Sequence, residues 1–407
     1  MRFQTLYTKH LYQKIFLLFF CITISSCTEQ YIFQSNTFED ILVVQARITN
    51  ELKKQEIKIS RSFRLGETTP TMEAGANVYI SEDGNKTYEF EFEEYSGLYV
   101  SKEPFQALPE KSYQLHITTK DGKSYSSATQ TLTAISDVQV EPKVETIDGY
   151  KGVQIQVTNY DPSAKSKFYR YEYEETYKIV SPAWSPNRLI VDPNSPNKEE
   201  PNFLMIPRQG ETRVCYTTKK SDDLILLSTV GQSEDRINLP IRFIDISNPI
   251  LNERYSIIVR QYVQSLESYT YYTTQKKLST SKSLLSQVQP GFNYGNLQSD
   301  DNPDEKIIGY FEVSSVSSKR IFFNFRDLFK DDQYPPFYTN CTPTELANCW
   351  DAKGCAGATI LALIKSPAPE KVFYGQRDNM GIIIFFPPGC TDCTKISSNI
   401  KPLFWID

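Results

Sequence analysis

Short runs in which apolar and polar residues alternate recur along most of the chain, and they constrain the fold more than any other feature. Tyr113, Leu115 and Ile117 alternate with polar neighbours, and Asp121-Gly122 then offers a tight turn. A period of two places the apolar residues on one face of a β-strand and the polar residues on the other. The sequence therefore predicts a mainly β fold.

The expected strands fall into two groups, which predict two domains. Residues 27–135 are expected to form an immunoglobulin-like or fibronectin-like β-sandwich, because short strands follow one another closely there. The stretch 108–113 resembles the approach to the sixth strand of such a sandwich. Residues 136–407 are expected to form a larger β-rich domain with two or three short helices and a disulfide-stapled C-terminal part. The expected strands are residues 40–44, 57–59, 77–80, 88–92, 113–117, 138–144, 153–157, 168–180, 223–229, 255–263, 360–364 and 381–386.

Two expected helices and one expected loop interrupt these strands. Apolar residues recur at helical spacing from Leu266 onward. Residues 342–345 form a capping box with proline at the first helical position, and Gly354 would end the helix that follows. Residues 181–201 contain five prolines, which predict a long loop without regular structure.

The N-terminus predicts export and attachment to a membrane. Residues 1–26 join a basic start, carrying Arg2, Lys9 and Lys14, to an apolar run of about ten residues, as a secretory signal peptide does. Ile24-Ser25-Ser26-Cys27 is similar to a bacterial lipobox, in which the cysteine is acylated and becomes the new N-terminus. We therefore expect a lipid anchor at Cys27; an ordinary signal peptide with a chance cysteine is the alternative.

The charge balance excludes one class of partner. Removal of the leader takes three basic residues and no acidic residue, which leaves 41 Lys and Arg against 49 Asp and Glu. The resulting formal charge, about −8, argues against nucleic acid, whose binding requires clustered Lys and Arg. We expect no nucleic-acid partner.

Six cysteines remain after the leader and Cys27, and we expect them to form disulfides. An even number of cysteines in an exported chain favours a disulfide framework. Cys390 and Cys393 form a Cys-x-x-Cys pair, for which zinc binding and redox chemistry are the alternatives. These two cysteines could bond to each other or to different partners. The disulfide candidates are Cys215, Cys341, Cys349, Cys355, Cys390 and Cys393.

A search for catalytic motifs gives no enzyme class. His116 is the only histidine after the leader and lies on the polar face of an expected strand, and no nucleophile elbow, zinc-protease motif or phosphate loop occurs. The acids at 300–305 could hold calcium, but a solvated turn fits their spacing better. Glu172, Glu174 and Glu175 could contribute to a glycosidase pair, although acids on a strand are common. We expect a non-enzymatic protein without a metal or cofactor.

Aromatic residues are abundant, with 26 Tyr and 24 Phe, and some are candidates for contact with a partner. Most are expected to be structural, since strands favour aromatic residues. Trp184 lies in the expected proline-rich loop, and three aromatic residues surround Pro335-Pro336. The possible partner-binding residues are Trp184, Tyr334, Phe337 and Tyr338.

Several short motifs, in order along the chain, resemble one family of proteins. They are the lipobox, residues 41–44, 213–216, 254–262 and 306–311, Cys390-Thr391-Asp392-Cys393 and residues 402–405. Together they resemble a family of Bacteroidota lipoproteins known as domain of unknown function 4249. The resemblance implies a surface-exposed outer-membrane lipoprotein, often encoded beside a TonB-dependent transporter, and no catalytic residues.

These expectations lead to one principal function and one alternative. The principal hypothesis is an accessory binding protein, anchored by lipid at the outer membrane, that partners a TonB-dependent transporter in uptake. The alternative is a structural or adhesive surface lipoprotein that binds envelope glycans or other cells. A hydrolase with an unfamiliar site is a third hypothesis.

Overall fold

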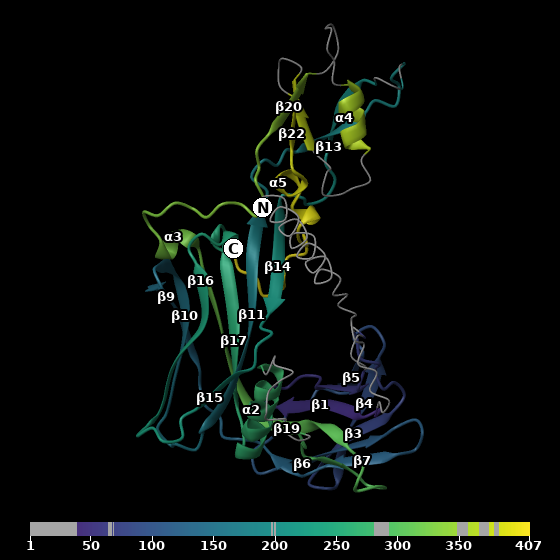
Figure 1. Cartoon of the computed structure of the whole chain (residues 1–407), viewed down its shortest axis with the longest axis vertical. Helices are drawn as coiled ribbons and strands as arrows, with labels where there is room; N and C mark the ends of the chain where they lie inside the picture. Colours follow the sequence, from purple (N-terminus) through teal and green to yellow (C-terminus); the bar gives the residue numbers. More distant parts are fainter. Residues whose placement is uncertain are drawn as a thin grey trace, which may run out of the picture.

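The computed structural model describes residues 39–63, 67, 69–196, 198, 201–280, 293–347, 357–365, 374–377 and 382–407. The predicted mainly β fold is confirmed, with strands throughout and a few short helices. Figure 1 shows an upright group of strands, a second group that lies across its base, and a small group above it. The leader and the cysteines at 27, 349 and 355 lie outside the described residues.

The lower group of strands comes mainly from the N-terminal part of the chain. Hydrogen bonds connect its strands in the order β1-β2-β5-β4-β3-β6-β7, and β8 pairs with β6. Alternate residues of these strands point into one core, in which Tyr99, Tyr113 and Tyr125 are fully buried. The strands are β1 (Leu42–Thr49), β2 (Glu56–Arg61), β3 (Asn77–Glu82), β4 (Lys86–Glu93), β5 (Leu98–Ser101), β6 (Ser112–Thr118), β7 (Ser124–Ser127) and β8 (Gln130–Thr131).

One contact in the lower group is typical of immunoglobulin-like sandwiches. The Tyr113 hydroxyl, at the start of β6, accepts a hydrogen bond from the Leu108 backbone N–H at 2.9 Å. The same hydroxyl donates to the Glu82 carboxylate at 3.2 Å. A tyrosine that bonds back to the backbone a few residues upstream is the tyrosine corner of such sandwiches. It fixes the approach to β6.

The upright group consists of two sheets that share a second core. One sheet has the order β16-β10-β9, and in the other β14-β11-β17-β19 are neighbours, with β15 beside β11. Buried residues of both sheets, such as Ile155, Tyr171 and Val259, belong to the same apolar cluster. The strands are β9 (Gln139–Ile147), β10 (Tyr150–Asp161), β11 (Phe168–Val180), β14 (Val214–Lys220), β15 (Ile225–Ser228), β16 (Asp235–Asp245), β17 (Tyr255–Val263) and β19 (Ile307–Phe323).

The long strand β19 joins the lower and upright groups. Its first half, from Ile307 to Ser314, pairs with β1 in parallel, and its second half, from Ser315 to Phe323, pairs with β17 in antiparallel. The hydrogen-bonded path therefore runs through both groups as one 14-stranded sheet. β18 (Leu297–Ser299) pairs with β7 at its far end. Residues after 135 thus complete the sheet formed by the N-terminal strands.

The small upper group is a separate apolar unit. A hairpin and a three-stranded sheet, in the order β20-β22-β21, pack with one helix around Phe203, Ile360, Ile383 and Phe385. Its elements are β12 (Asn187–Val191), β13 (Phe203–Pro207), β20 (Thr344–Ala347), α4 (Gly357–Ile364), β21 (Tyr374–Arg377) and β22 (Ile382–Phe386). The remaining helices are η1 (Pro249–Leu251), α2 (Leu266–Thr280), α3 (Phe325–Leu328), α5 (Pro388–Thr391) and η3 (Cys393–Lys395). No helix in the described part of the chain is both long and apolar enough to cross a bilayer.

Three local predictions are wrong, all in the upper group. The capping box at 342–345 was expected to open a helix, but Thr344–Ala347 is a strand paired with β22. The expected strand at 360–364 belongs to helix α4 instead. The region 181–201 was expected to lack regular structure, yet it contains β12, which pairs with β13. Contacts between distant segments override the local signal in each case. The helix expected from Leu266 onward is confirmed as α2.

Candidate binding cleft and the disulfide-linked module

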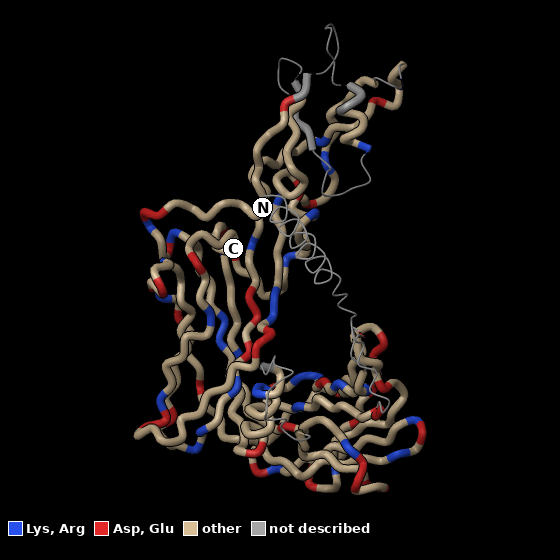
Figure 2. Tube along the Cα trace, viewed as in Figure 1, with Lys and Arg blue, Asp and Glu red and all other residues tan. Residues whose placement is uncertain are grey.

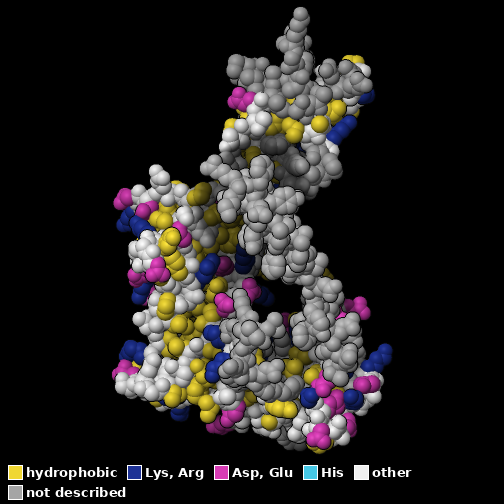
Figure 3. Space-filling model, viewed as in Figure 1, with side chains coloured by type: hydrophobic (Ala, Val, Ile, Leu, Met, Phe, Trp, Pro, Cys, Tyr) yellow, Lys and Arg dark blue, Asp and Glu magenta, His cyan; other side chains and the backbone are white. Residues whose placement is uncertain are grey.

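A cavity of about 700 Å³ lies where the lower sheet, α2 and the upright sheet meet. The volume falls within the range of small-molecule sites, about 300–1,000 Å³. Its walls come from β1 and β2, from α2, from β11 with the turn before β15, and from β19. In Figure 3 charged side chains of both signs border the hollow between the upright and lower groups. We call this cavity the cleft.

The base of the cleft contains a buried ion pair. Arg170 on β11 and Glu312 on β19 lie 3.0 Å apart, and their side chains are only 6% and 2% exposed. Gln264 donates a hydrogen bond to the same carboxylate at 3.1 Å. Burial is the largest influence and lowers the pKa of Arg170, but Glu312, Tyr272, Glu172 and Tyr262 together outweigh it, and the net pKa is raised. Arg170 is therefore a fixed positive charge at this position.

A second ion pair lies nearer the mouth of the cleft. Arg47 on β1 contacts Glu172 on β11 at 3.0 Å, so it bridges the lower and upright groups. The Tyr262 hydroxyl donates to Glu172 at 3.2 Å, and the Arg47 guanidinium lies 4.0 Å above the Tyr262 ring. A guanidinium that stacks on a ring while it pairs with a carboxylate is held in one orientation.

Tyrosine rings form the apolar part of the cleft wall. Tyr271 and Tyr310 line it with their ring centroids 5.3 Å apart, and Tyr272 packs 4.5 Å from the Arg170 guanidinium. Burial raises the pKa of Tyr271 to about 12 and that of Tyr310 to about 12. Both hydroxyls therefore stay protonated at neutral pH, and that of Tyr310 donates to the Gln130 side chain at 3.5 Å.

Four further charged residues at the cleft form no ion pair within the described part of the chain. Lys54 and Lys58 lie on the side formed by the lower sheet, and Asp222 and Asp223 lie in the turn before β15. Within the described residues, none of these four side chains forms a salt bridge. Figure 2 shows acidic positions at the lower end of the upright sheet and basic positions on the lower sheet across from it. The cleft therefore has a basic side and an acidic side.

The three glutamates of β11 are held in separate ion pairs. Glu172 pairs with Arg47, and Glu174 lies 3.7 Å from Arg320. Glu175 points to the other face of the strand, where it pairs with Arg242 at 3.2 Å and accepts from the Tyr255 hydroxyl. Each carboxylate pairs with a different arginine, and these pairs hold the three glutamate side chains in fixed positions.

One disulfide connects the C-terminal segment to the upright sheet, and a second joins the segments before β20 and after β22. Cys215 on β14 bonds to Cys393, and Cys341 bonds to Cys390. The disulfide prediction is therefore confirmed for four of the six candidates; the other two lie outside the described residues. Because Cys390 and Cys393 have different partners, the pair is neither a redox disulfide nor a zinc knuckle in this structure.

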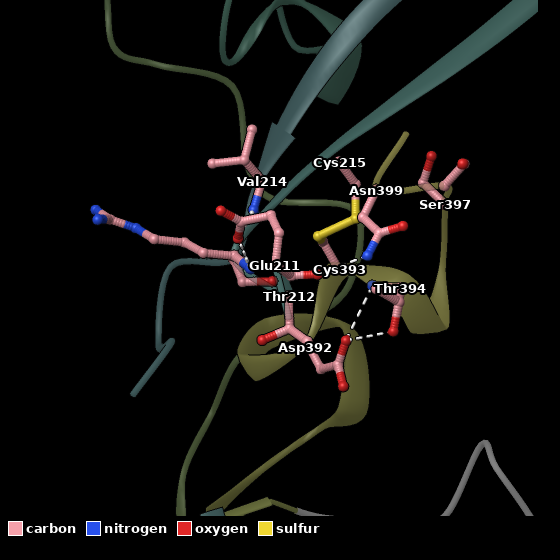
Figure 4. Close-up of a disulfide and its surroundings, with 12 residues drawn as sticks. Glu211, Thr212, Val214, Cys215, Asp392, Cys393, Thr394, Ser397 and Asn399 are labelled. Carbon is pink, nitrogen blue, oxygen red and sulfur yellow. Dashed lines mark hydrogen bonds between the residues drawn. A yellow bond between two sulfur atoms is a disulfide. The ribbon is translucent and has the colours of Figure 1, made fainter. Parts of the chain in front are cut away.

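Hydrogen bonds around the first disulfide fix the C-terminal segment against β14 (Figure 4). The Cys393 N–H donates to the Thr212 carbonyl at 2.9 Å, and Tyr216 donates to Ser398 at 2.8 Å. Asp392 accepts from the Thr394 N–H at 3.0 Å and so caps the turn of η3. The segment that follows the upper group is thus joined to the upright group by one disulfide and by backbone hydrogen bonds.

The four aromatic residues considered for partner binding lie in different surroundings. Trp184 is half-buried and donates from Nε1 to Thr212 at 3.0 Å. Tyr334 is 50% exposed and stacks on Phe325 with ring centroids 4.8 Å apart. Phe337 and Tyr338 are half-buried and pack against the core of the upright group. A role in partner binding remains a prediction for all four.

The other polar candidates have structural partners. Asp300 accepts a hydrogen bond from the Ser126 hydroxyl, and Asp301 accepts one from the Ser124 N–H at 2.9 Å. Both acids therefore stabilise the position of β7. The His116 ring stacks on Tyr79, and burial lowers its pKa. Within the described residues, no three His, Cys, Asp or Glu side chains are grouped as a metal ion would require.

The sequence did not indicate the cleft, because its residues come from distant strands. Arg170 and Glu312 are 142 positions apart and meet only through the pairing of β11, β17 and β19. One signal was present: each is a charged residue within a long strand of largely buried positions. A buried charge requires a partner, so two such residues in different strands are a reasonable pair to consider.

The comparisons with known proteins include a family match and a remote structural match. A family model described as Domain of unknown function (DUF4249) matches residues 28–320, a range that contains every residue lining the cleft. No curated protein matches the chain. A solved structure titled "Biofilm associated protein - BSP domain" is 9% identical with a TM-score of 0.14. The alignment covers 70% of this chain and 59% of that one.

Proposed function

The chain belongs to the DUF4249 family, a domain of unknown function, and from this premise we propose that it is a non-catalytic binding protein anchored by lipid at the outer-membrane surface. The observation that carries the proposal is the cleft, a cavity of about 700 Å³ whose buried charges are held in fixed pairs. Preformed polar groups in a concave site are typical of ligand binding. Paired carboxylates are poorly placed to exchange protons with a substrate.

The proposed location and partner follow from the sequence. The leader and Cys27 favour a lipid anchor, and two or more acyl chains give stable attachment to a membrane. The resemblance to outer-membrane lipoproteins favours a TonB-dependent transporter as the partner. The protein would then hold a ligand at the mouth of the transporter and assist its uptake.

The test is affinity capture of the full-length lipidated chain from detergent-solubilised membranes of its native host. We expect a TonB-dependent transporter to co-purify in near-equimolar amount. Cys27→Ala is the control: it should lose radiolabelled palmitate and leave the membrane fraction. Capture without any transporter, together with binding to envelope glycans or other cells, would replace this proposal with an adhesive function.

A further inference from the structure

The unpaired charges of the cleft are separated by sign, and this separation restricts the ligand. Lys54 and Lys58 belong to the side formed by the lower sheet, beside Glu56 and the salt-bridged Arg47 and Lys53, and Lys276 on α2 also lines the cavity. Asp222 and Asp223 lie on the opposite side. A ligand that bears one negative and one positive end complements both sides.

The apolar surface between these charges suits a chain with side groups. Tyr271 and Tyr310 line the cleft as rigid rings, and the Tyr271 hydroxyl can donate a hydrogen bond. A peptide backbone offers carbonyl acceptors to this donor and side chains to the rings. An extended tetrapeptide spans roughly 13 Å, at about 3.3 Å per residue. A cavity of about 700 Å³ is large enough to enclose a short peptide.

One buried donor at the base of the cleft has no acceptor. Arg170 lines the cavity, its side chain is more than nine-tenths buried, and its Nε finds no hydrogen-bond partner within the described residues. An unsatisfied buried donor costs free energy, about 1–3 kcal/mol. An oxygen atom of a ligand at the base of the cleft would satisfy this N–H.

We propose that the cleft binds short peptides with free ends, with the carboxylate toward Lys54 and Lys58 and the ammonium toward Asp222 and Asp223. This inference rests on the proposed function and names the class of ligand that the binding protein holds. A neutral oligosaccharide would leave both charged sides unused, and an anionic one would face the aspartates. A zwitterionic chain uses all four charges.

The experiment measures binding of defined peptides to the full-length protein in detergent. The probe is a synthetic tetrapeptide mixture with randomised sequence and both ends free, and retained peptides are quantified by mass spectrometry. The same mixture is prepared with acetylated N-termini, and again with amidated C-termini. We expect either modification to lower retention about three- to fivefold, as the loss of one exposed charge pair does.

Two double variants assign each end of the peptide to its side of the cleft. The double variant Lys54→Gln and Lys58→Gln should retain free-ended peptides about three- to fivefold less, and C-terminal amidation should then have no further effect on retention. The double variant Asp222→Asn and Asp223→Asn should lower retention by the same factor, and N-terminal acetylation should then have no further effect. The matched controls are Lys143→Gln on β9 and Asp148→Asn in the turn after it, which lie outside the cleft and should change nothing.

The outcomes separate this inference from the proposed function. Capture of the transporter with no retention of peptides, or with retention that is indifferent to blocked ends, would overturn the peptide assignment and leave the proposed function standing. Stronger retention of neutral or anionic oligosaccharides than of peptides would also overturn it. Retention of peptides without any transporter would support the peptide site and contradict the proposed function.

Discussion

At the scale of single residues, the pair Arg170–Glu312 illustrates how the cleft is held. Removal of both charges from water costs several kcal/mol per ion, and their attraction offsets that cost only with good geometry and further hydrogen bonds. Gln264 donates to Glu312, and Tyr272 packs against Arg170. The pair therefore contributes little net stability, but the loss of Glu312 leaves the buried Arg170 only the more distant and part-exposed Glu172, at 3.8 Å, as a counter-charge.

We predict that Glu312→Gln destabilises the protein strongly. The amide keeps the shape of the side chain but leaves Arg170 charged and buried, which costs about 3 kcal/mol in the free energy of unfolding. Urea denaturation followed by fluorescence measures this change. Glu39→Gln is the control. Glu39 pairs with Lys306, both side chains are exposed, and exposed ion pairs contribute less than about 1 kcal/mol to stability. Equal effects of the two substitutions would contradict the prediction.

We also predict a loss of stability at alkaline pH, to which two tyrosines of the cleft contribute together with buried tyrosines elsewhere, such as Tyr113. Tyr271 and Tyr310 have pKa values raised by burial from 10.0 to about 12, so the folded state disfavours their ionised form. Their contribution is fully present below pH 10 and is lost as the pH rises from 10 through 12. The melting temperature should fall over this window.

Part of the alkaline loss can be traced to these two tyrosines by substitution. Replacement of both Tyr271 and Tyr310 by Phe should make the fall in melting temperature between pH 10 and pH 12 smaller, because neither ring then ionises on unfolding. Tyr95→Phe, at a fully exposed position, should leave the fall unchanged. An unaltered fall in the double variant would place the titrating groups elsewhere.

At the scale of elements, the sequence predicted the long strands well and the upper group poorly. The expected strands at 168–180 and 255–263 match β11 and β17 in full, because their patterns extend over many residues. The capping box at 342–345 is a local helix signal, but cross-strand contacts such as Thr344 with Phe385 decide the structure there. Periodicity cannot distinguish a short apolar run such as Gly357–Ile364 from a strand.

The disulfides give an element-scale prediction about the upper group. Cys215–Cys393 closes a loop of 178 residues, and Cys341–Cys390 closes one of 49. The chain-entropy model assigns about 5 kcal/mol to the longer loop and about 4 kcal/mol to the shorter. We expect a Cys215→Ser and Cys393→Ser variant to lose more stability in urea than a Cys341→Ser and Cys390→Ser variant. Non-reducing peptide mapping that finds Cys390 bonded to Cys393 would contradict both pairings.

At the scale of the whole molecule, β19 makes the lower and upright groups one folding unit. The sequence predicted most of the strands, but not that residues 307–314 pair with β1 across more than 250 positions. Such pairing between distant segments leaves no local signal in the sequence, because any strand with alternating apolar and polar residues could pair with β1. The cleft was missed for the same reason, since it forms where β1, β11 and β19 come together.

A substitution of Gly309 on β19 tests whether this strand couples the unfolding of the lower and upright groups. Its φ of +147° is a conformation that side chains rarely adopt, and a Cβ atom there would overlap the carbonyl oxygen of Val44 on β1. Gly309→Ala should therefore lower the free energy of unfolding by about 2 kcal/mol, through backbone strain and a weakened β1–β19 ladder. In calorimetry we expect one transition for the native chain and two for the variant, because the lower group would unfold before the upright group. Ser318→Ala, at an exposed position of the same strand, should keep the single transition. Two transitions in the native chain would mean that β19 does not couple the groups, and the cleft would then lie between independently folding parts.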